Sequence, residues 1–311
     1  MADSLARIRS ILREAEAEEA AGTAAPSAGI AASRAAGCAP PAASPPPASW
    51  SLLPLHVPAA SLASLSAALA PLAPGLRLST HDALAGLVWT LRSALAGTGL
   101  PGEACAGRFI VALDLAGNGL PPGVLPDDFT GNAAAALSVA APEAGGPDDV
   151  AAAAPAAVRD AAPRELLALA RAAGAVRGAV QAYRSAPRNA VRHLLACGQR
   201  GTRAVAPAPG AWRGGEEQPL VGYATSCLRV PLDRLDCGTG APAALHYSTL
   251  PLRSASGLLF ASLAPAPRGD GALVLLAASD AHAAQIKAAA GPAAEVLRTA
   301  VPGARLLVAR P

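Results

Sequence analysis

The chain has 311 residues, long enough for one large domain or two small ones. Charged residues make up 15% and hydrophobic residues 52%, but aromatic residues only 3%, so we expect a core built mainly from Leu, Val and Ala. A net charge of +3 is too small to indicate a nucleic acid or an anionic membrane surface as partner. The five cysteines are odd in number and have no C-x-x-C spacing, which argues against a disulfide framework or zinc ribbon and favours a reducing compartment.

Residues 1–49 are predicted to form a segment without a packed core. The pattern over residues 3–20 indicates a charged helix, and residues 21–49 are an Ala/Pro/Ser-rich stretch typical of a flexible linker. Acidic residues in the first helix interrupt the apolar run that a secretory signal requires, and they are equally unlike an organellar transit peptide. We therefore expect a cytoplasmic protein without a membrane span.

Residues 50–311 read as one globular domain. Apolar periodicity predicts, in chain order, a strand over 53–57, helices over 61–70 and 79–95, strands over 108–115 and 134–140, and a helix-rich region over 149–197 broken near Pro163 and Pro187. Further strands are predicted over 221–224, 227–230, 257–263 and 272–278, followed by helices over 281–289 and 293–300 and a strand over 304–309. Ser79 and Asp82 have the spacing of a capping box at the start of the 79–95 helix.

Four short motifs follow one another along this domain. Residues 78–89 read LSTHDALAGLVW, and residues 111–132 contain VALD, a proline-rich stretch and FTGN. Residues 225–242 read TSCLRVPLDRLDCGTGAP, and residues 269–274 read GDGALV. Their order and spacing resemble those of the BAHD acyl-CoA-dependent acyltransferases of the hydroxycinnamoyl type. The resemblance covers the C-terminal half of that family and implies an α/β fold, a chloramphenicol acetyltransferase-like layer of mixed β-sheet and helices that forms the second half of a two-domain fold.

The resemblance implies transfer of an acyl group, other than an aminoacyl group, from acyl-CoA to a small alcohol or amine. Acyl-CoA would be a co-substrate, and no bound cofactor or metal is expected. The family's catalytic H-x-x-x-D motif is absent, because the residues four positions after the five histidines are Ala60, Ala85, Cys197, Leu250 and Ile286. A general base contributes roughly 10²–10⁴-fold in rate, so we expect the base to lie outside these residues, in a missing or separately supplied N-terminal half.

The resemblance also implies roles for individual residues. Thr225 would donate to the developing oxyanion or bind the acceptor, the alternative being an ordinary strand threonine. Ser79 and Thr80 would contact coenzyme A at a helix start, or simply cap the helix. Asn132 would lie in a turn near the active centre, or be an ordinary turn residue.

The D-x-G-x-G motif has a structural role in the family. Its members here are Asp236, Gly238 and Gly240. The family's aromatic positions are replaced by Cys237 and Thr239, so the motif has lost large side chains. This decay favours an alternative in which the chain is a non-catalytic remnant that acts as a binding or interaction module. A half-domain would expose an apolar face, so self-association is also expected.

Six arginines recur at intervals that place them along one side of a helix. They are Arg164, Arg171, Arg177, Arg184, Arg188 and Arg192. The pattern predicts a solvated helix face, and a nucleic-acid contact is disfavoured because no aromatic residues are interleaved with the arginines.

Overall fold

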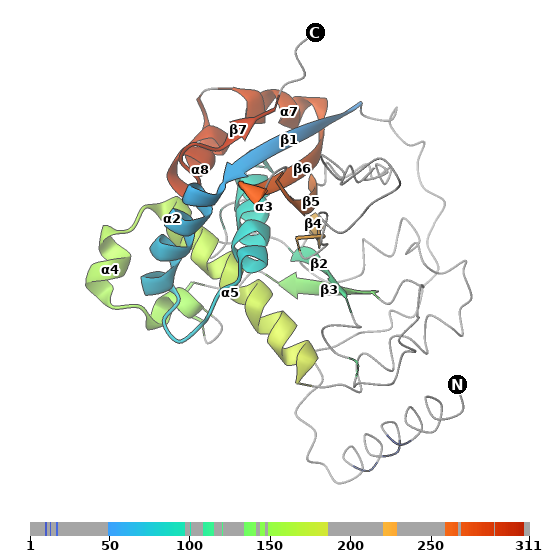
Figure 1. Ribbon diagram of the computed structural model, residues 1–311. Helices are drawn as coiled ribbons and strands as arrows, with labels where there is room; N and C mark the ends of the chain where they lie inside the picture. The colour runs from blue at the N-terminus through green and yellow to red at the C-terminus, as the bar shows by residue number, and fades with distance from the viewer. Residues whose placement is uncertain are drawn as a thin grey trace, which may run out of the picture. The chain divides into compact units, whose positions relative to one another are not determined.

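The computed structural model describes residues 49–96, 100, 108–114, 120, 134–140, 144–146, 149–185, 220–228, 259–266, 269–288 and 290–307, together with residues 10, 13 and 17 (Figure 1). The predicted N-terminal helix and linker lie outside this range, apart from Ser10, Arg13 and Ala17, which are helical. The predicted boundary after residue 49 stays a prediction.

The chain divides into two compact units. One comprises Met1–Pro40, Ala112–Leu137 and Gly178–Glu216. Its described residues are mainly the end of one strand, the start of the next and the end of a long helix. The other comprises Pro41–Val111, Ser138–Arg177 and Glu217–Pro311, and it contains the residues discussed below.

The described strands form one mixed sheet of seven strands, in the order β3-β2-β4-β5-β6-β1-β7. In chain order they are β1 (Trp50–Pro58), β2 (Arg108–Asp114), β3 (Ala134–Ala140), β4 (Leu220–Ser226), β5 (Leu259–Pro265), β6 (Gly271–Ser279) and β7 (Arg305–Leu306). The β2–β4 and β4–β5 pairs are parallel, whereas β5–β6, β6–β1 and β1–β7 are antiparallel. The α/β layer predicted from the element pattern is thus the observed architecture.

The centre of the sheet is buried on both faces. Every residue of β6 from Ala272 to Ala278 is buried, as expected for a continuous apolar run between two partner strands. The neighbouring β1 instead alternates, burying Leu53, Leu55 and Val57. Where β6 begins, Gly271 has φ +135°, and a Cβ there would lie 2.1 Å from the carbonyl oxygen of Val57. Glycine is therefore required at this strand start.

Helical segments lie between these strands along the chain. They are α2 (Ala59–Leu69), the 3₁₀ turn η1 (Ala70–Leu72), α3 (Thr80–Ala96), the 3₁₀ turn η2 (Val150–Ala153), α4 (Ala156–Ala161), α5 (Arg164–Arg184), α7 (Asp280–Lys287) and α8 (Pro292–Ala300). Helix α3 is buried at every residue from 82 to 93 and contacts β4, β5 and α8. Its Trp89 stacks on Phe109 of β2 at a centroid distance of 5.3 Å. Within the described residues, no helix has both the length and the apolar character needed to cross a membrane.

The start of one predicted strand is wrong. A new strand is predicted over residues 227–230, but β4 runs without a break to Ser226, and Cys227 and Leu228 follow it outside any strand. Residues 229–230 lie outside the described residues. The backbone N–H of Cys227 makes one more bond across the sheet, donating to Leu263 at 2.7 Å. The next N–H, of Leu228, donates to the side chain of Ser226 at 3.4 Å, a local bond that competes with the sheet ladder.

Candidate functional site

A reciprocal capping box starts helix α3, as its sequence predicts. The backbone N–H of Asp82 donates to Ser79 Oγ at 3.2 Å, and the backbone N–H of Ser79 donates to Asp82 Oδ2 at 2.8 Å. The Ser79 hydroxyl also donates to Asp82 Oδ2 at 2.7 Å. Together these bonds satisfy groups that a helix start would otherwise leave unpaired.

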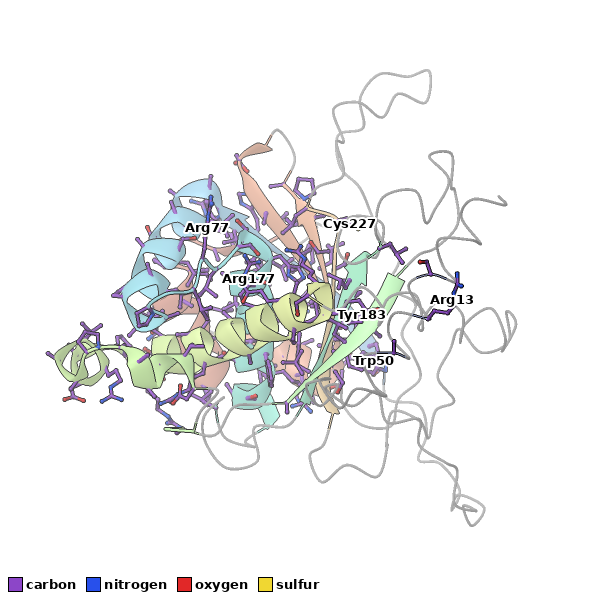
Figure 2. The ribbon with its side chains drawn as sticks, turned by 90° about the horizontal axis from the view of Figure 1, so that it is seen from below. Arg13, Trp50, Arg77, Arg177, Tyr183 and Cys227 are labelled. Atoms are coloured by element: carbon purple, nitrogen blue, oxygen red, sulfur yellow. The ribbon has the colours of Figure 1, made fainter. Side chains whose placement is uncertain are left out.

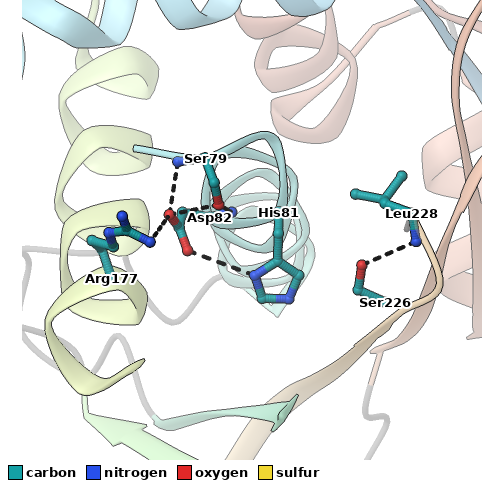
Figure 3. Close-up of polar contacts among 6 residues, drawn as sticks. All are labelled: Ser79, His81, Asp82, Arg177, Ser226 and Leu228. Atoms are coloured by element: carbon teal, nitrogen blue, oxygen red, sulfur yellow. Dashed lines mark hydrogen bonds and ion pairs between the residues drawn. The ribbon is translucent and has the colours of Figure 1, made fainter. Parts of the chain in front are cut away.

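Asp82 is a buried carboxylate with partners on both oxygens. Its side chain is 2% exposed, and Arg177 Nη1 lies 3.6 Å from Oδ2, while His81 Nδ1 lies 3.6 Å from Oδ1 (Figure 3). Burial acts to raise the pKa of Asp82, but the interactions with His81 and Ser79 outweigh it and leave the pKa below its ordinary value. The carboxylate also lies at the positive end of the α3 dipole. Asp82 is therefore an ionised acid at neutral pH.

Close packing of two helices brings Arg177 to this carboxylate. A Cβ at Gly86 of α3 would lie 2.9 Å from the backbone N of Ala173 and 3.0 Å from its Cβ, so α5 passes directly over Gly86. Asp82 is one turn before Gly86, and Arg177 is one turn after Ala173. The two helices thus run antiparallel at this contact, and glycine permits the approach.

A second arginine of α5 holds another buried acid. Arg171 Nε lies 3.1 Å from both carboxylate oxygens of Asp149, whose side chain is 1% exposed. Asp149 also caps η2, accepting from the backbone N–H of Ala151 at 3.0 Å. Arg171 and Arg177 are each 19% exposed, so they are not members of a solvated face as predicted. The reason is that each pairs with an acid distant in sequence, which periodicity does not reveal. Arg188 and Arg192 lie outside the described residues.

The end of β4 carries Thr225, which is half-buried and pairs in register with Ser262 of β5. Burial raises the pKa of Tyr223, two residues earlier on the same strand, and a hydrogen bond with Thr225 partly opposes the rise. The Thr225 hydroxyl thus has a phenol partner in this structure. Cys227 just beyond is half-buried and forms no disulfide (Figure 2).

His81 lies between the capping box and this strand end. Figure 3 shows its ring below α3, with Asp82 on one side and Ser226 and Leu228 on the other. The side chain is 21% exposed, and its Nε2 atom is buried without a hydrogen-bond partner among the described residues. The H-x-x-x-D signature does not identify His81, because the residue four positions later is Ala85. The signal available was a histidine next to the acid of a capping box.

A cavity of about 470 Å³ lies beside the start of α3. It is lined by Ser66, Leu69, Ala70, Ala73, Gly75, Leu76, Arg77, Leu78 and Ala83, which belong to α2, η1, the following loop and the first turn of α3. The lining is mostly apolar, with one exposed cation, Arg77 (Figure 2). Leu78, which lines the cavity, is the residue before Ser79, so the cavity adjoins the helix cap.

The predicted site residues fall into two groups. Ser79, Thr80 and Thr225 are described: Ser79 caps α3, Thr80 is exposed at its first turn, and Thr225 ends β4. The others lie outside the described residues, namely Asn132, Asp236, Gly238 and Gly240. Within the described part of the chain, no group of three or more His, Cys, Asp or Glu side chains has the arrangement of a metal site.

Comparison with known proteins supports the fold. No family model matches the sequence, and no curated protein matches it. The fold is similar to that of F. graminearum TRI101 complexed with coenzyme A and T-2 mycotoxin, with a TM-score of 0.50 and 16% identity over 79% of this chain and 49% of that chain. F. sporotrichioides TRI101 complexed with coenzyme A and T-2 has a TM-score of 0.47 at 17% identity, covering 78% of this chain and 49% of its own. Vinorine synthase has a TM-score of 0.44 at 17% identity, covering 76% of this chain and 45% of its own.

The chain spans about half the length of the TRI101 structure. At this identity the likeness concerns the fold alone. It confirms the predicted mixed α/β fold. That the chain corresponds to the second half of the two-domain fold stays a prediction.

Proposed function

We propose that the protein takes part in acyl transfer from acyl-CoA to a small alcohol or amine acceptor. The observation that carries this proposal is the fold, which over 79% of the chain is similar to a structure that contains coenzyme A. The order of the four motifs supports the same reaction class independently, because it is a property of the sequence alone and does not depend on the fold. The donor's acyl group and the acceptor are not specified by either observation.

The start of α3 is the proposed place for coenzyme A. The exposed Thr80 hydroxyl and the first backbone N–H groups of α3 suit a phosphate or a pantetheine amide, since a helix start favours anions. Arg77 adds a positive charge two residues before Ser79, and the adjoining cavity is apolar enough for an acyl chain or an adenine ring. In this proposal Ser79 stays with Asp82 as the helix cap, and Thr80 and Arg77 make the ligand contacts.

Thr225 is the proposed donor to the tetrahedral intermediate. Its hydroxyl lies at the end of a central strand, where packing on β5 holds the backbone in place. A hydroxyl that donates to the oxyanion stabilises the transition state by about 3 kcal/mol. To act, the hydroxyl must turn from the Tyr223 phenol, to which it is bonded here, toward the substrate.

The test is release of coenzyme A by the purified full chain, using acetyl-, malonyl- and hydroxycinnamoyl-CoA with a panel of alcohols and amines. We expect turnover with at least one pair, and roughly a 100-fold lower kcat for Thr225→Val, because one oxyanion donor is lost. Thr299→Val is the matched control, since the Thr299 hydroxyl bonds to Glu295 within α8. Equal losses in both variants would contradict the role of Thr225.

A second candidate function is a binding module without turnover. It is favoured by the D-x-G-x-G motif of this chain, in which Cys237 and Thr239 replace the aromatic positions of the family that the sequence resembles. Saturable binding of coenzyme A with no thioester turnover under any donor and acceptor would support this function over the first.

A further inference from the structure

The two oxygens of the Asp82 carboxylate have different partners. Oδ2 accepts hydrogen bonds from the Ser79 backbone N–H and the Ser79 hydroxyl, and it forms an ion pair with the Arg177 guanidinium. Oδ1 faces His81 Nδ1 at 3.6 Å. The helix cap and the arginine therefore fix the carboxylate plane through one oxygen and present the other to the imidazole ring.

This arrangement sets which ring nitrogen of His81 carries the proton. An ionised carboxylate only accepts hydrogen bonds, so it favours the neutral tautomer with hydrogen on Nδ1. The lone pair then resides on Nε2, which is directed away from Asp82 (Figure 3). Among the described residues no group donates to this atom, although it is buried. A buried acceptor without a partner is unusual in a folded protein and indicates a group that receives its partner from outside.

The lone pair lies at the part of the fold that the proposed function uses. Helix α3 packs on β4, and the His81 ring lies on the side of α3 that faces the end of β4, where Ser226 follows Thr225 (Figure 3). Thr80, proposed above to contact coenzyme A, is the residue before His81. One short segment therefore joins the helix start, the histidine and the buried acid.

We propose that His81 is the general base of the acyl transfer and that Asp82 is its positioning residue, which supplies the function of the absent H-x-x-x-D motif from within this chain. The proposal rests on the proposed function. The 3.6 Å separation is longer than a hydrogen bond, as catalytic contacts often are before substrate binds.

The reaction balances with these groups alone. His81 Nε2 takes the proton of the acceptor hydroxyl or amine while the acceptor oxygen or nitrogen bonds to the thioester carbonyl carbon. Thr225 donates to the oxyanion that forms. The intermediate collapses with cleavage of the C–S bond, and the proton on Nε2 passes to the departing thiolate. The products are the acylated acceptor and free coenzyme A, and His81 returns to its neutral form.

The orientation of His81 can be tested without any substrate. In ¹⁵N-histidine-labelled full-length protein, long-range ¹H–¹⁵N spectra at pH 8 should show His81 protonated on Nδ1, with the signal assigned by its loss in His81→Gln. In Asp82→Asn the side-chain amide can donate to Nδ1, so the proton should move to Nε2. A wild-type ring protonated on Nε2, or a tautomer unaffected by Asp82→Asn, would overturn the proposal.

The catalytic role is tested by kinetics and binding measured side by side. His81→Gln should lower kcat about 100-fold or more, because a general base contributes roughly 10²–10⁴-fold, and should leave the Kd for coenzyme A within about threefold. His56→Gln is the matched control and should keep wild-type turnover, since His56 of β1 pairs with Asp270 and lies outside the site. His81→Asn guards against a folding defect particular to glutamine, and thermal unfolding verifies that each variant is folded.

The outcomes separate this proposal from the proposed function. Turnover by His81→Gln and His81→Asn within threefold of wild type would overturn the role of His81 and leave acyl transfer standing. Wild-type protein that binds coenzyme A but turns over no acyl-CoA would also overturn the base. Failure of the wild-type chain to bind coenzyme A would instead remove the proposed function on which the base depends.

Discussion

Asp82 combines three roles at the level of a single residue. It caps α3, pairs with an arginine of α5 and orients the imidazole of His81. The first role could be predicted from the sequence, because Ser79 and Asp82 have the spacing of a capping box. The other two could not, because Arg177 belongs to another helix and His81 has no motif that announces it. Only the packed fold brings the arginine to the acid.

The first prediction concerns acid stability. Asp82→Asn should lower the free energy of unfolding by about 1–2 kcal/mol at pH 7, since a charged cap and its ion pair are weakened. The folded pKa of Asp82 lies below the ordinary value of 3.8, so the unfolded chain takes up the proton first. The difference between wild type and variant should therefore be fully present above pH 3.8 and vanish as the pH falls through the folded pKa.

Urea unfolding followed over a pH series measures this difference. Asp160→Asn is the control, because Asp160 is exposed on α4 and the substitution should change stability by less than about 0.5 kcal/mol. A wild-type advantage over Asp82→Asn that grew on acidification would show the sign to be wrong.

The second prediction concerns His282 on α7. Burial, and then the charge of Arg92, lower the pKa of His282 below 6.5. Because the unfolded chain binds this proton more readily, the protein should lose stability as the pH falls below 6.5, and His282→Gln should remove part of that loss. Thermal midpoints of both proteins between pH 7.5 and pH 5 check this expectation. If the thermal midpoints of wild type and His282→Gln fell by the same amount on acidification, His282 would not contribute to the loss of stability.

At the level of elements, the contact between α3 and α5 depends on Gly86. Alanine is normally favoured over glycine in a helix by about 1 kcal/mol, but here its Cβ would meet the backbone of Ala173 at 2.9 Å. Gly86→Ala should therefore destabilise the protein by roughly 1–3 kcal/mol, because the helices must separate. It should also shift the His81 signal described above, since Arg177 would draw back from Asp82.

Gly178→Ala on α5 is the matched control for this third prediction. A Cβ at Gly178 meets nothing within 4 Å, so the same substitution should stabilise the protein by up to about 1 kcal/mol. Urea unfolding of the two variants distinguishes the effect of helix–helix packing from the effect of intrinsic helix propensity. Stabilisation by both substitutions would contradict the close approach.

Most elements were predictable because they bury one face or both. The strand 134–140 and the start of β6 agree with the predicted ranges to within one residue. The error at residues 227–228 arose because the apolar Cys227 and Leu228 continue the pattern of a strand, whereas the local bond from Leu228 to Ser226 depends on geometry. Pairing along β4 also crosses Thr225 and Ser226, where the sequence pattern suggested a break.

At the level of the whole molecule, the chain covers about half of the TRI101 structure to which it is similar. If these 311 residues are produced on their own, an apolar face that packs against another part of such a fold would be uncovered, so the fourth prediction is self-association of the isolated chain. Sedimentation velocity should show species larger than a monomer, with a proportion that rises with concentration and persists at high salt, because apolar contacts are not screened. A monomer at every concentration would contradict an uncovered apolar face.

The sequence motifs indicated the fold class correctly because their order reports the order of elements. They could not locate the site, because its chemistry depends on which side chains meet across α3, α5 and β4. Thr225 was found through its motif, whereas His81 required the structure.

Binding of coenzyme A to the full chain, measured by isothermal titration calorimetry, tests the central claim most directly. We predict saturable binding with one site per chain, weakened by Arg77→Ala through loss of a charge beside the helix start. Arg305→Ala should leave binding unchanged, because Arg305 lies on the edge strand β7 and does not line the cavity. Absence of a saturable heat signal up to about 1 mM coenzyme A would contradict an acyl-CoA-binding fold. A Kd of about 1 mM corresponds to a binding free energy of only about −4 kcal/mol.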